Sequence, residues 1–206
     1  MKRSKINILS IICTGLLLFS FTILFYSCSC GCGVNSSSDV PLNILIKSND
    51  FIISKTGNIF FEKYITAEFA QIKYEPPYYK MVYRFFMPEK PFVDGLIKFS
   101  VDSLGNVDNS HEISGIPDFK NNPESCSFFI DERNAIRLAK NFGLEKGIID
   151  WKIGILWDST LNRYVWHILS TFSQSGDTSN YKGNGKELII DPGNGKILAV
   201  NFWHIP

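Results

Sequence analysis

The N-terminal segment constrains this chain more than any other feature. Lys2, Arg3 and Lys5 precede an uncharged run, residues 6–26, that is rich in Ile, Leu and Phe. A basic stretch followed by an apolar one is typical of an export signal. The run is also long enough for a helix that crosses a bilayer, which needs about 20 residues. Because Lys and Arg stay on the inner side of a membrane, both alternatives place the rest of the chain outside the cytoplasm.

The residues that end this run favour a cleaved signal with a lipid anchor. The segment Leu24-Phe25-Tyr26-Ser27-Cys28 places a small residue directly before a cysteine, and it resembles the lipobox of bacterial lipoproteins. In that family the cysteine thiol receives a diacylglycerol, the signal is cut before it, and the cysteine becomes the new N-terminus. The resemblance implies lipidation of Cys28 and a lipoprotein of the cell envelope. An uncleaved membrane helix and ordinary secretion stay open as alternatives.

The next segment, residues 28–40, reads as a flexible tether because it is rich in Gly and Ser. Its three cysteines would suit a soft metal, but no other Cys or His pair at a useful spacing completes such a site. We therefore expect neither a metal nor a cofactor. The cysteine count does not describe a disulfide framework. Cys126 can pair with Cys30 or Cys32, or it can be a buried thiol, which we favour.

Composition favours a folded domain without nucleic acid as a partner. Hydrophobic residues make up 45% of the chain and charged residues 20%, which is typical of a globular protein. The chain has 21 basic and 20 acidic residues; the leader holds three of the basic ones, so the remainder has a net charge of −2. Nucleic-acid binding needs a clustered basic surface, and the basic residues here are scattered.

The C-terminal half has a clear pattern of one helix and two strands. Asp131 can cap a helix that Gly143 ends, with apolar residues at helical spacing between them: Ala135, Ile136, Leu138, Ala139 and Phe142. Apolar and polar residues then alternate over 151–157 and again from 163 to 172. This alternation predicts two half-buried strands joined by a turn.

The remainder of this half predicts a loop and a second hairpin. The polar segment 173–185 is expected to be a long loop. Strands are expected over 187–191 and 196–201, on either side of Pro192-Gly-Asn-Gly195. That turn is a strong hairpin signal because Gly and Asn tolerate positive φ.

The N-terminal half repeats this order. A helix is expected over 41–56, closed by Gly57. Three strands follow, with a turn at Glu75-Pro-Pro77 and a hairpin turn at 102–106; they span 65–74, 79–87 and 97–101. The spacing from Gly57 to Tyr79 differs by one position from that between Gly143 and Tyr164.

We therefore predict an α+β fold with two helix-plus-antiparallel-sheet units that arose by internal duplication. The expected parts are a signal or anchor at 1–27, a tether at 28–40, a first unit at 41–125 and a second unit at 126–206. Each helix is expected to cover one face of its small sheet.

The second unit is similar to a PepSY domain. The resemblance covers about residues 131–200 and is carried by the helix from Asp131, the strands at Trp151 and Tyr164, and the closing run Ile189-Ile-Asp-Pro-Gly-Asn-Gly-Lys-Ile-Leu198. PepSY domains occur outside the cytoplasm, in peptidase propeptides and in membrane-associated or lipid-anchored proteins. The resemblance implies a non-catalytic module with an inhibitory or ligand-binding role.

Signatures of catalysis are not recognisable in the sequence. His111 lacks the second His that a zinc-peptidase helix needs four residues away. His167 is expected to be a satisfied core or edge histidine in a strand, and His204 is third from the C-terminus. No Ser lies in a Gly-x-Ser-x-Gly elbow. Gly183-Asn-Gly185 and Gly193-Asn-Gly195 are interpreted as hairpin glycines rather than a phosphate cradle, which needs a helix N-terminus. Asp102 and Asp191 could form a pair of carboxylates, but both are at strand-to-turn junctions and are expected to cap turns. We therefore predict that the protein is not an enzyme.

Aromatic strand residues are the best remaining binding candidates. Trp151, Trp157, Tyr164 and Trp166 fall on neighbouring predicted strands, where they either pack in the core or line an open face that receives a peptide or glycan. The first hypothesis is a lipid-anchored, non-catalytic binding protein with two PepSY-like units. It would engage a protein or peptide in the envelope, and restraint of a peptidase is one role that such a contact could serve. The alternatives are an envelope assembly protein without a small ligand, and an enzyme built from scattered residues.

Overall fold

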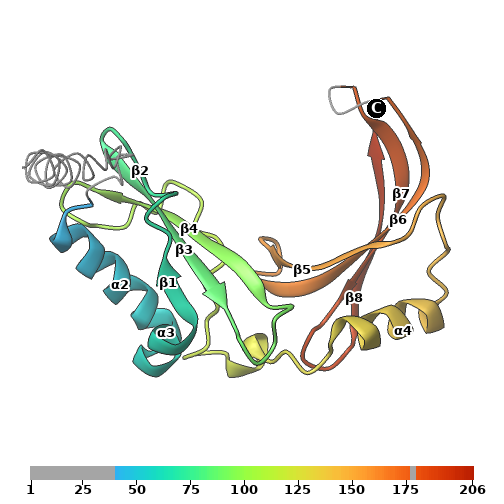
Figure 1. Cartoon of the computed structure of the whole chain (residues 1–206), viewed down its shortest axis with the longest axis horizontal. Coiled ribbons are helices and arrows are strands. Elements are labelled where there is room, and N and C mark those ends of the chain that lie inside the picture. The colour runs from blue at the N-terminus through green and yellow to red at the C-terminus, as the bar shows by residue number, and fades with distance from the viewer. Residues whose placement is uncertain (1–39, 177–179) are drawn as a thin grey trace, which may run out of the picture. The chain divides into compact units, whose positions relative to one another are not determined.

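A computed structural model describes residues 40–176 and 180–206 of the chain. Within them lie three α-helices and two four-stranded antiparallel sheets, so the predicted α+β class is correct (Figure 1). None of the helices in this part of the chain is both long and apolar enough to cross a membrane. The predictions for the leader, for Cys28 and for the tether lie outside the described residues.

The first half begins with two helices where the sequence predicted one. Helix α2 (Leu42–Thr56) matches the expected helix over 41–56, and Gly57 ends it with a φ of 82°. Helix α3 (Asn58–Tyr64), which we did not predict, starts directly after this glycine. Its Phe60 is buried, and the Phe60 ring stacks on that of Phe119 at 4.8 Å between centroids. Tertiary packing of aromatic rings thus accompanies a helix too short to be stable alone.

The first sheet is built around β3 (Tyr78–Phe86). Strand β4 (Asp94–Asp102) pairs along the whole of β3, so β1 (Ile65–Ala67) and β2 (Lys73–Glu75) share the opposite edge. The single strand predicted over 65–74 is wrong, because the chain turns between β1 and β2. That turn buries Ile72, an apolar side chain that a straight strand would have carried along the edge of the sheet.

The second sheet is a meander of four strands in sequence order. Its strands are β5 (Lys152–Asp158), β6 (Arg163–Ser175), β7 (Lys182–Ile190) and β8 (Ile197–Ile205). Helix α4 (Glu132–Phe142) has the predicted N-cap, Asp131, and the predicted C-terminal glycine, Gly143, in the left-handed conformation. The turns predicted between β5 and β6 and between β7 and β8 are also present.

The polar loop predicted over 173–185 is wrong. Strands β6 and β7 continue through most of it, with Ser173 opposite Asn184 and Ser175 opposite Lys182. Gly183 and Gly185 are therefore strand residues and not hairpin glycines. A Cβ on Gly185 would overlap the Ser170 carbonyl oxygen and lie 2.7 Å from the Trp203 ring. Close packing, rather than a turn, thus explains this glycine.

A single hydrophobic cluster includes residues from both halves of the chain. The described residues belong to one compact unit, in which η1 (Pro123–Cys126) lies between the last strand of the first sheet and α4. The Tyr164 hydroxyl donates to the Gly115 carbonyl at 3.0 Å, and the Phe92 ring stacks on Trp166 at 5.5 Å. Cys126 is buried in the same cluster, in agreement with the alternative we favoured; its predicted rivals, Cys30 and Cys32, lie outside the described residues.

The strand glycines of the second sheet provide a test of this packing. We expect Gly185→Ala to lower the free energy of unfolding by about 1–3 kcal/mol, because the added methyl group must displace the Ser170 backbone or the Trp203 ring. Gly154→Ala in β5 is the matched control, since a Cβ there meets nothing within 4 Å. Its free energy of unfolding should stay unchanged or rise by up to about 1 kcal/mol. Urea denaturation measures both, and equal losses would contradict the assigned register.

Candidate functional site

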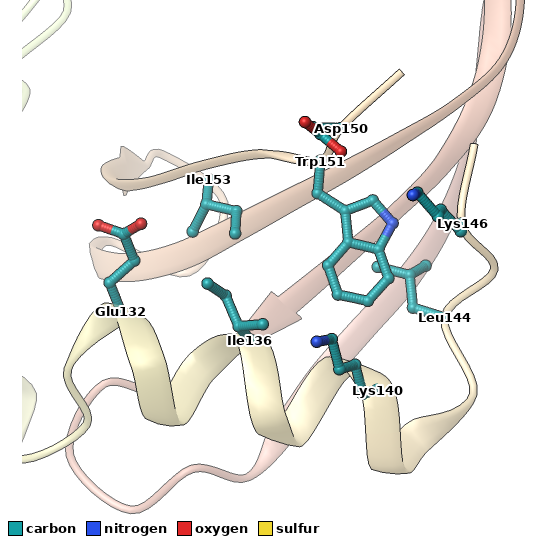
Figure 2. A pocket seen from close by; sticks show the side chains of 8 residues that line it. All are labelled: Glu132, Ile136, Lys140, Leu144, Lys146, Asp150, Trp151 and Ile153. Carbon is teal, nitrogen blue, oxygen red and sulfur yellow. The ribbon is translucent and has the colours of Figure 1, made fainter. Parts of the chain in front are cut away.

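A groove of about 520 Å³ separates helix α4 from strand β5, one of the two edge strands of the second sheet (Figure 2). One wall comes from α4, the other from β5, and the loop between them closes one end. Apolar and charged side chains both line it: Glu132, Ile136, Lys140, Leu144, Lys146, Asp150, Trp151 and Ile153.

The helix wall follows from the sequence of α4. Glu132, Ile136 and Lys140 are four residues apart and so lie on one face of the helix, where Figure 2 shows them along the groove. Ala135 and Ala139 are fully buried beneath. Their small side chains let the helix approach the sheet closely and leave the longer side chains at the flank.

The strand wall is formed by alternate residues of the segment that enters β5. Trp151 and Ile153 point toward α4 in Figure 2, as expected for positions two apart in an extended chain. The Trp151 indole donates from Nε1 to the Glu145 carbonyl at 3.0 Å. This hydrogen bond holds the half-buried ring at one end of the groove.

The charged side chains of the groove are available to a ligand. Within residues 40–176 and 180–206, neither Glu132, Lys140, Lys146 nor Asp150 has a side-chain hydrogen bond or an ion pair. Glu132 lies at one end of the row on α4, and Lys140 lies at the other (Figure 2). The two ends of the groove therefore carry opposite charges on the helix wall.

The backbone edge of β5 is the second binding element. Strand β5 pairs with β6, and in the part of the chain that the structure describes no other strand pairs with it. An unpaired edge presents N–H and C=O groups that can accept another extended chain. The side chains that line the groove include no Ser, Thr, Cys or His.

The four predicted aromatic residues do not form a shared surface. Trp166 and Tyr164 are only 1% and 2% exposed, because they pack in the core that joins the two halves. Burial also raises the pKa of the Tyr164 hydroxyl. Trp157 is half-buried and contacts the Tyr164 ring edge-on at 5.2 Å. Of the four, Trp151 alone lines the groove.

Sequence reasoning missed the α4 wall. The apolar residues of α4 were all assigned to the buried face, although Ile136 is only half-buried. The available signal was the row Glu132, Ile136 and Lys140, a charged–apolar–charged series four residues apart on a helix next to a short strand. That row is distinct from the buried row of alanines.

The two aspartates predicted to cap turns do so, in separate turns of separate sheets. The Asp102 carboxylate accepts from the side-chain amide of Asn106 at 2.9 Å and from the backbone N–H of Leu104 at 2.8 Å, which lowers its pKa. The Asp191 carboxylate accepts from the Gly193 N–H at 2.7 Å and pairs with Arg163 at 3.1 Å. These carboxylates are therefore not brought together as a catalytic pair.

The histidines lie away from the groove. His167 Nδ1 is 2.6 Å from Glu187 Oε1, on the face of the sheet opposite Ile153. His111 contacts Asp108 in the first half. Hydrogen bonds to the Asp108 carboxylate, above all from the Ser110 side chain, lower its pKa to about 2. No group of three or more His, Cys, Asp or Glu residues that could hold a metal ion occurs among the described residues.

Neither the protein-family models nor the curated proteins compared with this chain give a match. The comparisons therefore identify no ligand or activity for the chain. The groove combines a strand edge that no other described strand pairs with, an apolar centre and opposite charges at the two ends of its helix wall.

Two tryptophan variants separate the core from the groove. We expect Trp166→Ala to lower the free energy of unfolding by about 3–5 kcal/mol, because it empties a fully buried site and removes the hydrogen bond from Nε1 to the Ile130 carbonyl. Trp151→Ala should cost less than about 2 kcal/mol, since its ring is half-exposed and has one hydrogen bond. Chemical denaturation followed by circular dichroism measures both. A larger loss for Trp151→Ala would contradict the placement of the two rings.

Proposed function

We propose that this chain is a lipid-anchored, extracytoplasmic binding protein without catalytic activity, and that its α4–β5 groove takes an extended segment of another protein. The observation that carries the proposal is the groove itself, which lies along an unpaired strand edge. Its partner would be a protein or peptide of the cell envelope. A peptidase held by such a contact would be restrained, as the resemblance to PepSY domains suggests.

Binding would proceed by strand addition. A chain that pairs with β5 lies about 4.7–4.9 Å from it and extends the second sheet by one strand. Its alternate side chains would then point to the same side as Trp151 and Ile153, into the groove between α4 and β5. Main-chain hydrogen bonds would supply affinity for any sequence, and the groove would select among side chains.

The proposal includes two duplicated, PepSY-like units, and the hairpin turns support it. In the first half the Asp102 N–H donates to the Asn106 carbonyl and the Gly105 N–H to the Asp102 carbonyl, each at 2.9 Å. In the second half the Asp191 N–H donates to the Lys196 carbonyl and the Gly195 N–H to the Asp191 carbonyl, each at 2.9 Å. Both glycines have positive φ, 82° and 77°.

Each half also ends in an exit segment that returns along the preceding strand. In the second half this segment is β8, whereas in the first it is reduced to the isolated bridges Val101–Val107 and Lys98–Ser114. A common order of helix, strands, Asp-led turn and exit segment is what a duplication predicts.

Strand addition predicts a periodic response to backbone methylation. A peptide selected from a random library on the full chain should lose affinity at least tenfold when alternate residues in one phase are N-methylated, because each methyl group removes a donor to β5. Methylation in the other phase should leave the dissociation constant within about threefold, since those N–H groups point away from the edge. Fluorescence anisotropy measures both series.

Matched variants locate the site. Ile136→Asp should weaken binding at least tenfold, because it places a charge at the apolar centre of the groove. Phe202→Asp is the control: this residue is on β8, the other edge of the sheet, and is 77% exposed. Equal effects of both methylation phases, or a loss with Phe202→Asp alone, would overturn the β5 site. Failure to select any peptide would favour the assembly protein instead.

The lipid anchor makes a separate prediction. Cys28→Ala should leave an unprocessed precursor in membranes of the producing bacterium, because the modified thiol is the proposed signal for cleavage before residue 28. Gel mobility and incorporation of labelled fatty acid measure processing and lipidation. Cys126→Ala is a control, since this buried thiol lies in the folded unit. Normal processing and lipidation of the Cys28→Ala chain would show that Cys28 is not the lipidated residue.

A further inference from the structure

We infer that the groove selects its ligand by charge order, and that its preferred strand carries a basic, an apolar and an acidic residue at alternate positions, in that order from the N-terminus. This inference rests on the proposed strand addition at β5 and adds the chemical class of the ligand. It is drawn from the row Glu132, Ile136 and Lys140 and from the direction of β5.

The spacing of the helix row fits that of a strand. Residues four apart in an α-helix are about 6 Å apart along the axis, at a rise of about 1.5 Å per residue. Alternate residues of a strand are about 6.4–6.8 Å apart. Over the two intervals from Glu132 to Lys140 the mismatch amounts to less than about 2 Å, which flexible side chains absorb. Three successive inward-facing side chains of a bound strand can therefore meet the three residues of the row one by one.

The polarity of the row defines what each position accepts. Glu132 and Lys140 have no ion-pair partner among the described residues, and burial under a ligand without one would be unfavourable. A basic side chain opposite Glu132 and an acidic one opposite Lys140 restore both interactions. Between them, Ile136 faces Trp151 and Ile153 in Figure 2, so the middle position favours an apolar side chain.

The direction of the strands sets the order. In Figure 2, Trp151 lies near Lys140 and Ile153 lies toward Glu132, so β5 runs opposite to α4. A ligand antiparallel to β5 therefore runs from the Glu132 end to the Lys140 end. Antiparallel pairing is the more stable arrangement per residue and matches the rest of this sheet. The basic residue consequently comes first.

Two further charged residues, Lys146 and Asp150, lie toward the Lys140 end of the groove (Figure 2). Both line the groove, and neither has an ion-pair partner within the part of the chain that the structure describes. Because they carry opposite charges, the net charge at this end, with Lys140, stays positive. The acidic residue of the ligand is thus favoured there even when all three side chains are considered.

Three blocked peptides test the inference on the full chain in detergent. The first is Thr-Lys-Thr-Val-Thr-Glu-Thr, the second has Lys and Glu exchanged, and the third has Gln at both positions. The wild-type chain should bind the first peptide roughly three- to tenfold more tightly than the second, as expected for two partly exposed ion pairs. This preference should shrink in 1 M salt, where the Debye length is about 3 Å. The neutral peptide should fall between them.

A double charge exchange provides the decisive variant. Glu132→Lys combined with Lys140→Glu should invert the preference, so that the second peptide binds more tightly. The milder variants Glu132→Gln and Lys140→Gln should each reduce the wild-type preference, and they keep the test valid if the double variant does not fold.

The outcomes separate the two proposals. If the wild-type chain binds both charged peptides equally or prefers the second, and the neutral peptide still binds, the charge order is wrong while strand addition stands. If none of the three binds at millimolar concentration, the groove is not a peptide site and both proposals fall. Inversion of the preference by the double variant supports both.

Discussion

The backbone of Ile130 is the point on which the groove depends. Its carbonyl accepts the Trp166 indole N–H at 2.8 Å, and its N–H donates to the Pro192 carbonyl at 2.8 Å. One residue later Asp131 caps α4 by accepting the Asn134 N–H at 2.8 Å. The start of the helix is thus fixed to β6 and to the β7–β8 turn together. Trp166 also stacks on Phe92 of the first half, so the same ring links α4, the second sheet and the first half.

Given that fixed start, the composition of α4 decides how the helix meets the sheet. Ala135 and Ala139 are fully buried and allow close approach along one line. Glu132 and Lys140 lie on the flank toward β5, where they cannot be buried without a partner. The two charges line the groove and give its helix wall opposite charges at its two ends.

Local signals in the sequence predicted those parts of the fold that short-range chemistry determines. The helix from Asp131 to Gly143, the end of α2 at Gly57 and the turns led by Asp102 and Asp191 all follow from capping and positive-φ preferences. The errors lie where tertiary contacts decide. Phe60 packs on Phe119, far along the chain, and α3 forms with it; Trp203 covers Gly183 and Gly185 and turns a predicted loop into paired strands.

The candidate site shows the same division. The alternating pattern over 151–157 predicted Trp151 as a binding candidate, and Trp151 lines the groove. Tyr164 and Trp166 follow the same alternation, yet they are buried because their strand, β6, is internal to the sheet. Alternation identifies a buried face but not which strand is at the edge, and strand order depends on long-range pairing. Of the four aromatic residues that the sequence predicted as binding candidates, only Trp151 therefore lies in the groove.

The two halves differ at the edge that matters for the proposed function. In the first sheet the edge opposite β4 is divided into β1 and β2, three residues each, with a turn between them and Pro76 and Pro77 directly after. Short strands and prolines are common protections of an exposed edge, because they offer few consecutive donors. Strand β5 is an unbroken run of seven residues, with no proline in it. If the halves arose by duplication, the first has lost a continuous edge and the second has kept one. An unpaired edge of this kind carries a risk of aggregation, and the proposed ligand would cover it.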